Sequence, residues 1–132
     1  MEINIIKGKV VKILDEYRII VNLGIQQGVK NDMKFIVYSE GDWIRDPDSQ
    51  VVLGRLENIK TRVKPLHIQE NISIMETYEK EINKLAYYMS GSSTPSDRVE
   101  RQKPFIIEST TKKGIDPKLI IRVGDLVRQD FS

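Results

Sequence analysis

Short runs of β-branched and alternating apolar residues fill the first half of the chain, and they constrain its fold more than any other feature. Segment 8–14, GKVVKIL, is rich in β-branched residues and is followed by two acidic turn residues. Segment 17–23 largely alternates apolar and polar residues, as a strand with one buried face does. The two segments are predicted to form a β-hairpin, and the alternation within 33–37 predicts a third strand.

A fourth strand is predicted over 51–62, where the alternation changes phase partway along. Leu53 shares its phase with Ile59, whereas Leu56 falls on the opposite face. A strand with such a shift often contains a bulge or bends at the corner of a barrel. Pro65 cannot donate a hydrogen bond within a sheet, so we expect it at an edge or between strands.

A helical period follows this β-rich part. Apolar residues recur at spacings of three and four, as on one face of an α-helix. They are Met75, Tyr78, Ile82, Leu85 and Met89. The next residues, SGSSTPSD, are typical of a linker, and the polar composition continues to Lys103. Segment 74–103 is therefore predicted to be an insertion that consists of one α-helix and a mobile loop.

The apolar face of this helix has two interpretations, packing against the core or forming a seam with a partner. Exposed tyrosines beside it would favour the seam. The barrel itself would not require the insertion, so we expect the partner contact there. The side chains predicted for that contact are Tyr78, Ile82, Leu85, Tyr87 and Tyr88.

The C-terminal segment 119–131, LIIRVGDLVRQDF, is strongly strand-like. We expect it to pair with the N-terminal strands and close the sheet, because a closed sheet has no exposed edges. The chain is thus predicted to form a single all-β domain over residues 1–132. Its expected architecture is a small barrel of about six strands with one inserted α-helix and a flexible loop.

Two turns have similar sequences. Asn31 precedes Asp32, and Gly124 precedes Asp125, each just before a predicted strand. Asparagine and glycine best tolerate positive φ, so the same left-handed turn is predicted at both places. The two aspartates are expected to accept hydrogen bonds from local backbone amides.

Segment 46–49, Asp-Pro-Asp-Ser, separates two strand-like runs. Asp46 followed by Pro47 fits a type I turn at the tip of a hairpin. A calcium site would recruit Asp42, Asp46, Asp48 and Ser49, but the spacing lacks the central glycine and distal glutamate of an EF-hand. We therefore predict a hairpin rather than a metal site.

Catalytic groups are sparse. The chain has no cysteine, its single histidine, His67, lies in a strand-like segment, and no phosphate-binding loop motif occurs. We predict neither enzymatic activity nor a cofactor. The N-terminal residues lack the features of a signal peptide, and no apolar run approaches the roughly 20 residues of a membrane-spanning helix. A cytoplasmic protein without membrane insertion is expected.

Basic residues are balanced by acidic ones, since the net charge is +2 with 30% charged residues. A dedicated nucleic-acid binder usually has a larger basic excess. Arg55, Lys60, Arg62, Lys64 and His67 nevertheless cluster in sequence. Solvated strand faces are the simpler interpretation. The alternative is single-stranded nucleic acid, with phosphate contacts from Arg55, Arg62 and Lys64 and base stacking on Tyr38 or Trp43.

The run GKVVKILDEYRIIVNLGIQQGVKNDMKFIVY, the segment DPDSQVVLGRLE and the closing VGDLVR resemble a family of small bacterial β-barrel domains. That family includes the C-terminal domain of the flagellar assembly protein T. Its pattern places V-N-x-G before G-V-x-x-G-D-x-F-x-V, followed by D-P-x-T-G-x-x-L-G. The matching residues are Asn22, Gly24, Gly28, Val29, Asp32, Phe35, Asp46, Pro47, Leu53 and Gly54.

Asn31-Asp32 stand in place of the pattern's G-D, one residue closer to Gly28, and Ser49-Gln50 replace its T-G. The matching positions are turn residues rather than catalytic ones. The resemblance implies a barrel fold and a role in binding or assembly, and it transfers no active site. We therefore expect a non-catalytic binding or assembly module that contacts a protein partner or associates into a homo-oligomer.

Overall fold

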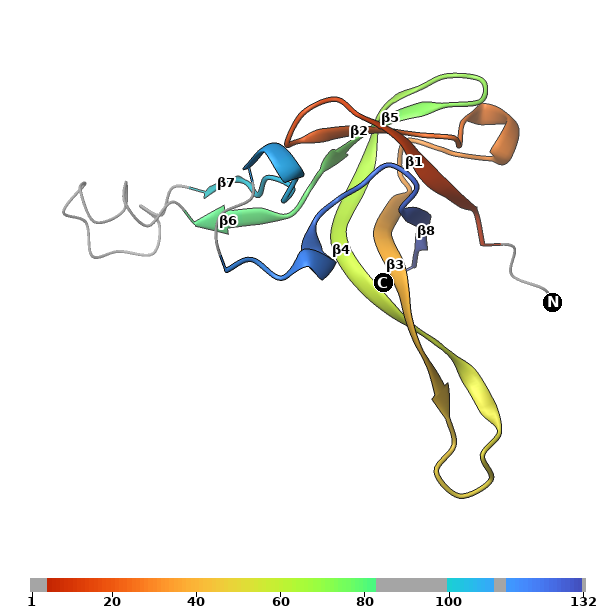
Figure 1. Ribbon diagram of the computed structural model, residues 1–132. Helices are drawn as coiled ribbons and strands as arrows, with labels where there is room; N and C mark the ends of the chain where they lie inside the picture. Colours follow the sequence, from red (N-terminus) through yellow and green to blue (C-terminus); the bar gives the residue numbers. More distant parts are fainter. Residues whose placement is uncertain (1–4, 83–99, 111–113, 132) are drawn as a thin grey trace.

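The computed structural model describes residues 5–82, 100–110 and 114–131. Six antiparallel strands follow one another in the order β1-β2-β5-β4-β3-β8, and the sheet closes because β8 pairs with both β3 and β1 (Figure 1). The ring strands are β1 (Lys7–Ile13), β2 (Arg18–Val21), β3 (Lys34–Arg45), β4 (Val52–Ile68), β5 (Ser73–Thr77) and β8 (Leu126–Asp130). The predictions of an all-β fold and of a C-terminal strand that closes the sheet are confirmed.

Shorter elements lie outside the ring. Strands β6 (Lys80–Ile82) and β7 (Glu100–Gln102) pair with each other. Among the described residues, the 3-10 helices are η1 (Ile25–Gln27), η3 (Glu108–Thr110) and η4 (Pro117–Leu119). Within the described ranges, no helix is long and apolar enough to cross a membrane.

The core fills the inside of the ring. The alternation seen in the sequence points one face of each strand inward, which places β-branched and aromatic side chains against one another. The buried cluster comprises Val10, Ile19, Val21, Leu23, Val29, Phe35, Val37, Val63, Met75, Phe105, Ile121 and Val127. Phe105 and Ile121 come from segments that are not strands, so the connections between strands also complete the core.

The prediction of an inserted helix is wrong over the residues that the structure describes. Its first turns are strand β5, in which Met75 pairs with Ile19 of β2 and with Pro65 of β4. Ser73, Met75 and Thr77 are fully buried and alternate with half-buried residues. Small polar residues at two inward positions hid this period of two, and the apolar spacing resembled a helix instead. Because β5 is part of the ring, segment 74–103 is not a dispensable insertion.

Other parts of that segment have different outcomes. Glu100–Gln102, predicted as part of the mobile loop, forms strand β7. The remaining linker and the predicted contacts Leu85, Tyr87 and Tyr88 lie outside the described residues. Pro65, expected at an edge or between strands, pairs only with β5 and lies beside a register shift, because the pairing of β4 with β3 ends at Val63. A bulge there accommodates a residue that cannot donate.

Strands β3 and β4 extend beyond the ring as a two-stranded ribbon (Figure 1). Strand β3 pairs with β8 only as far as Tyr38, and β4 pairs with β5 only from Val63 onward. The two strands otherwise pair with each other, with register shifts after Val37, Glu40 and Ile44. These shifts confirm the predicted change of phase. We call residues 40–56 the arm.

Candidate functional site

The tip of the arm is a hairpin, as predicted, but its turn is one residue longer than a type I turn. The backbone N–H of Gln50 donates to the carbonyl oxygen of Asp46 at 2.9 Å. The Asp46 carboxylate accepts from the backbone N–H groups of Asp48 and Ser49 at 2.8 and 3.0 Å. These two donors lower the pKa of Asp46 because they favour its charged form. Gln50 closes the turn with a φ of 61°, in the left-handed region.

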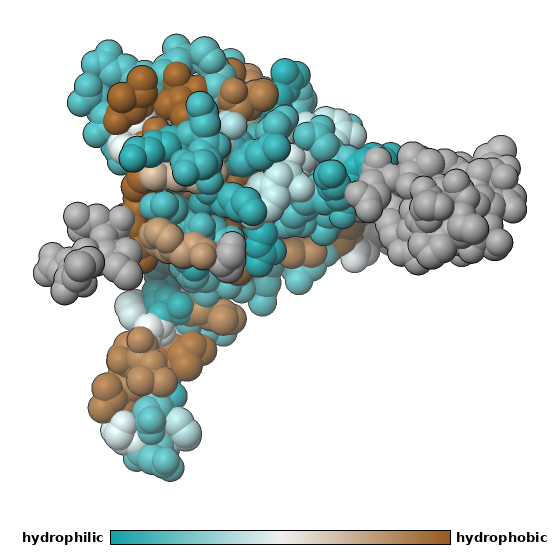
Figure 2. Space-filling view, turned by 180° about the vertical axis from the view of Figure 1, so that it is seen from behind, coloured by the Kyte–Doolittle hydropathy of each residue, from teal (hydrophilic) through white to brown (hydrophobic). Residues whose placement is uncertain are grey.

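Exposed apolar side chains cover much of the arm. Figure 2 shows hydrophobic residues gathered along it, next to a hydrophilic tip. Leu53 and Trp43 are 66% and 63% exposed, so most of each side chain contacts solvent. The other exposed apolar side chains of the arm are Ile44, Val51, Val52 and Leu56. Isolated exposed apolar residues are common on protein surfaces, whereas large contiguous apolar patches are rare on monomeric proteins.

Trp43 is held in place by a neighbouring charged residue on the opposite strand. Arg55 pairs directly with Trp43, and its guanidinium carbon lies 5.2 Å from the centroid of the indole ring. The same guanidinium donates to the Gly41 carbonyl at 3.1 Å and forms an ion pair with Glu40 at 2.7 Å. This arrangement limits the rotamers of Trp43 and presents the indole without a large entropy cost.

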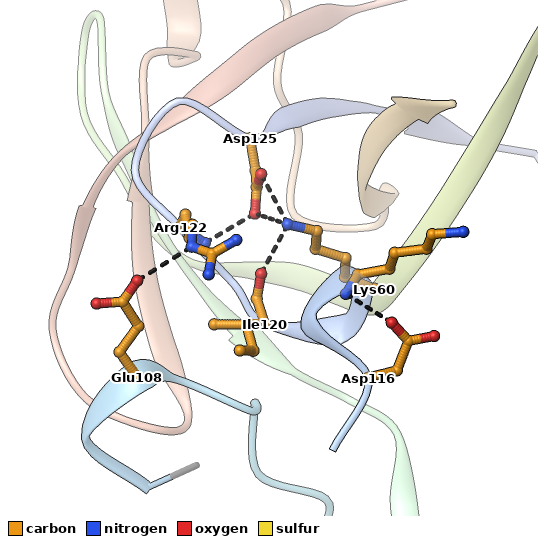
Figure 3. Close-up of polar contacts among 7 residues, drawn as sticks. Lys60, Glu108, Asp116, Ile120, Arg122 and Asp125 are labelled. Atoms are coloured by element: carbon orange, nitrogen blue, oxygen red, sulfur yellow. Dashed lines mark hydrogen bonds and ion pairs between the residues drawn. The ribbon is translucent and has the colours of Figure 1, made fainter. Parts of the chain in front are cut away.

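A polar cluster lies where the arm joins the ring. The ammonium group of Lys60 donates to both carboxylate oxygens of Asp125 and to the Ile120 carbonyl (Figure 3). Asp125 also accepts from the backbone N–H of Arg122 at 2.8 Å. Arg122 in turn forms an ion pair with Glu108 at 3.0 Å. The cluster therefore fastens β4 to the loop that precedes β8.

A cleft of ≈ 560 Å³ separates the base of the arm from the 117–125 loop. Both signs of charge line it: Glu40, Asp42, Arg55, Lys60, Lys118, Arg122 and Asp125. Among the described residues, no three His, Asp or Glu side chains gather in a group that could hold a metal ion. The exposed His67 lies on β4, on the wall of a different cleft.

The three basic residues predicted for nucleic-acid contact are not brought together. Arg55 lies on the arm, whereas Arg62 and Lys64 lie in the ring part of β4. Arg62 is 3.6 Å from Glu79, and Lys64 is 3.9 Å from Glu76, so both have carboxylate neighbours. Tyr38 is only 7% exposed, and the Arg128 guanidinium lies 5.9 Å from its ring centroid, so its ring is not accessible for base stacking.

Two residues predicted for partner contact fall within the described ranges. Tyr78 is half-buried just before β6, and the ammonium group of Lys34 lies 5.3 Å from its ring centroid. Burial raises the pKa of Tyr78, with a further contribution from the nearby Asp130 carboxylate. Ile82 is the last residue of β6. These positions lie outside the arm.

Three of the predicted turn glycines have the positive φ that glycine tolerates. Gly28, Gly54 and Gly124 have positive φ values of 92°, 154° and 96°. Asn31 does not, so the left-handed turn predicted there is wrong. Within the described ranges, the Asp32 carboxylate accepts no hydrogen bond, unlike that of Asp125.

Gly24 is required for a different reason, close packing. A Cβ at this position would lie 2.3 Å from the carbonyl oxygen of Gln69. Backbone atoms cannot yield at that distance, so any other residue would displace the strand connection. Gly24 thus holds η1 against the turn between β4 and β5.

The exposed apolar residues of the arm were not predicted from the sequence, although a signal was present. Residues 51–53 are apolar on both strand phases, which a strand with one solvated face does not need. A two-sided apolar run that extends past the core is instead typical of a strand that a further segment or a partner covers.

The chain matches no protein-family model, no curated protein and no solved structure.

Proposed function

We propose that this protein is a non-catalytic binding or assembly module, built on a small β-barrel, that docks on a protein partner through its arm. One observation carries the proposal. Six apolar side chains of the arm are exposed, and neither the closure of the ring nor the core requires them. The resemblance to small barrel domains of assembly proteins supports the same class of function.

The energetics of a two-stranded ribbon support a covered arm. A lone β-hairpin is marginally stable in water, and it gains stability when a third layer covers one face. Removing a half-exposed apolar side chain from water contributes on the order of 1 kcal/mol. Trp43, already ordered by Arg55, has the features of a binding hot spot. The arm therefore offers enough apolar surface for specific recognition.

The charges of the arm favour a protein over a nucleic acid. Four carboxylates, from Glu40, Asp42, Asp46 and Asp48, outnumber the guanidinium groups of Arg45 and Arg55. A net negative surface repels phosphates. Nucleic-acid binding through Arg55, Arg62 and Lys64 stays the alternative, and oligonucleotide affinity that falls steeply with salt would support it.

Site-specific crosslinking tests the docking surface. A photo-crosslinking residue in place of Leu53 should capture protein in the native cell, whereas the same residue in place of Lys30 should not. Lys30 is an exposed control position outside the arm, in the connection between η1 and β3. A Trp43→Ser substitution added to the Leu53 probe should reduce the capture strongly. Equal crosslinking from both positions, or none from position 53, would contradict a docking role for the arm.

A further inference from the structure

A second apolar surface lies at the β1–β2 end of the ring. It is a groove of ≈ 500 Å³ whose apolar lining consists of Ile13, Leu14, Ile107, Ile121 and Val123. Leu14 and Val123 are exposed, at 40% and 63%. The groove can therefore receive apolar side chains from outside. We call it the β1 groove.

The acidic side chains on the rim of the β1 groove are already neutralised. Asp15 forms an ion pair with Arg18 at 2.6 Å, and Glu108 forms one with Arg122 at 3.0 Å. Counted together with Arg18, the charged residues of the groove thus carry no net excess of either sign. Any electrostatic preference must come from the residues next to it.

The residues of β1 next to the groove are basic. Lys7, Lys9 and Lys12 are exposed along β1, which runs into the groove at Ile13. Within the part of the chain that the structure describes, Lys9 and Lys12 have no ion-pair partner. Strand β1 thus combines an apolar groove with a row of ammonium groups.

The arm is complementary to the β1 groove, because it combines apolar side chains with carboxylates. Its apolar side chains lie between carboxylates, and Asp42 and Asp48 have no ion-pair partner among the described residues. Apolar residues flanked by acids on one surface match an apolar groove flanked by lysines on the other. We propose that the arm of one copy of this protein docks in the β1 groove of a second copy.

The contact must be between molecules. Figure 1 shows the arm leaving the ring on the side away from the turn between β1 and β2, so the arm cannot reach its own groove. Two different surfaces then meet. Reciprocal docking gives a two-fold dimer, and docking in succession gives a closed ring or a filament. This inference rests on the proposed function, because it names the partner of the same arm.

Light scattering and sedimentation over a concentration series test the inference. The wild-type protein should assemble beyond a monomer, and added salt should weaken the assembly. Asp42→Lys with Asp48→Lys should weaken self-association at least about tenfold, because like charges then face each other. Lys9→Glu with Lys12→Glu should have the same effect. Neither pair of positions contributes to the core.

Mixing the two charge-reversed proteins provides the decisive test. The reversed arm of one then meets the reversed groove of the other, and a 1:1 complex should form. Lys30→Glu with Lys80→Glu is the matched control for the Lys9→Glu, Lys12→Glu pair, because it changes the net charge by the same amount at two exposed positions outside the arm and outside the lining of the β1 groove. That control should assemble as the wild type does, and melting curves verify that each variant is folded.

Two results would overturn the inference. One is a wild-type protein that stays monomeric at every concentration, and the other is an assembly that both charge reversals leave intact. If the wild type is monomeric while the Leu53 probe still captures another protein, the proposed function stands and only self-docking fails. If the probe also captures nothing, both fail.

Discussion

Lys60 and Asp125 are 65 residues apart in sequence, and their side chains form a buried ion pair with 2.8 Å between Nζ and Oδ2. The two side chains are only 4% and 10% exposed. The third ammonium proton is donated to the carbonyl of Ile120 at 2.6 Å. A buried charge is tolerated when its hydrogen-bonding capacity is filled, and here that holds for the whole ammonium group.

Replacing Lys60 with methionine should lower the free energy of unfolding by about 3 kcal/mol. Methionine fills a similar volume, but the Asp125 carboxylate is then left buried without its cation. Urea denaturation measures the loss. Lys64→Met is the matched control on the same strand, because Lys64 is 49% exposed and its ion pair is long, at 3.9 Å. That control should change stability by less than about 1 kcal/mol.

Adding Asp125→Asn to the Lys60→Met variant should recover part of the lost stability. The asparagine amide is neutral, and its oxygen can still accept from the backbone N–H of Arg122. The two single losses should therefore not add in the double variant. Strict additivity would show that the two charges do not stabilise each other.

The sequence could not predict this pair, although it did predict most of the ring. Strands such as β2 were recognisable because Ile19 and Val21 are buried and their neighbours are not. Lys60 looked like one member of a basic cluster, since nothing local indicates a partner 65 residues away. Contacts of that kind depend on the closure of the sheet, which only the fold reveals.

The arm and β5 show two further limits of the sequence pattern. Alternation predicted that residues after Val51 form a strand, but it could not show where the pairing of β4 with β5 ends. In β5 itself, Ser73 and Thr77 point inward, so the apolar positions no longer mark the buried face. Burial of small polar residues in a closed ring is set by the space available, which the sequence does not encode locally.

Glu57→Gln should weaken the acid dependence of stability. Arg128 contacts Glu57 through two hydrogen bonds of 2.9 and 2.8 Å, and these donors lower the pKa of Glu57 from its ordinary value of 4.5. Because the folded pKa is the lower one, this stabilisation is complete above the unfolded pKa and is lost as pH falls through the folded pKa.

The wild type should therefore be more stable than the Glu57→Gln variant at neutral pH, and the difference should shrink as pH is lowered below 4.5. Urea denaturation at a series of pH values measures it. Asp15 and Asp46 also have lowered pKa values, but they titrate in both proteins and cancel in the difference. A difference that grows in acid would contradict the role assigned to the ion pair.

Gln50→Gly should stabilise the tip of the arm. Gln50 has a φ of 61°, a conformation that costs a residue with a Cβ about 1 kcal/mol relative to glycine. The substitution removes one exposed hydrogen bond from Nε2 to the Pro47 carbonyl, which contributes less. Amide hydrogen exchange is the measurement, because the arm can open without unfolding the ring.

Exchange in the arm should slow by a few-fold in the Gln50→Gly protein, in line with a gain of about 1 kcal/mol or less. Gln50→Asn should lie between the two, since asparagine tolerates the left-handed region better than glutamine. Exchange in β2 serves as the internal control and should not change. Faster exchange at the tip of the glycine variant would contradict the assigned strain.

Thr77→Val should raise the free energy of unfolding by about 1 kcal/mol. The Thr77 hydroxyl oxygen is fully buried and has no hydrogen-bond partner among the described residues, whereas valine has the same shape without the polar atom.

Ser73 provides the opposite case on the same face of β5, because its hydroxyl donates to the Leu23 carbonyl at 2.6 Å. Ser73→Ala should therefore destabilise the protein by about 1 kcal/mol. Urea denaturation of the two variants should give shifts of opposite sign, and a destabilised Thr77→Val protein would show that this hydroxyl is satisfied in solution.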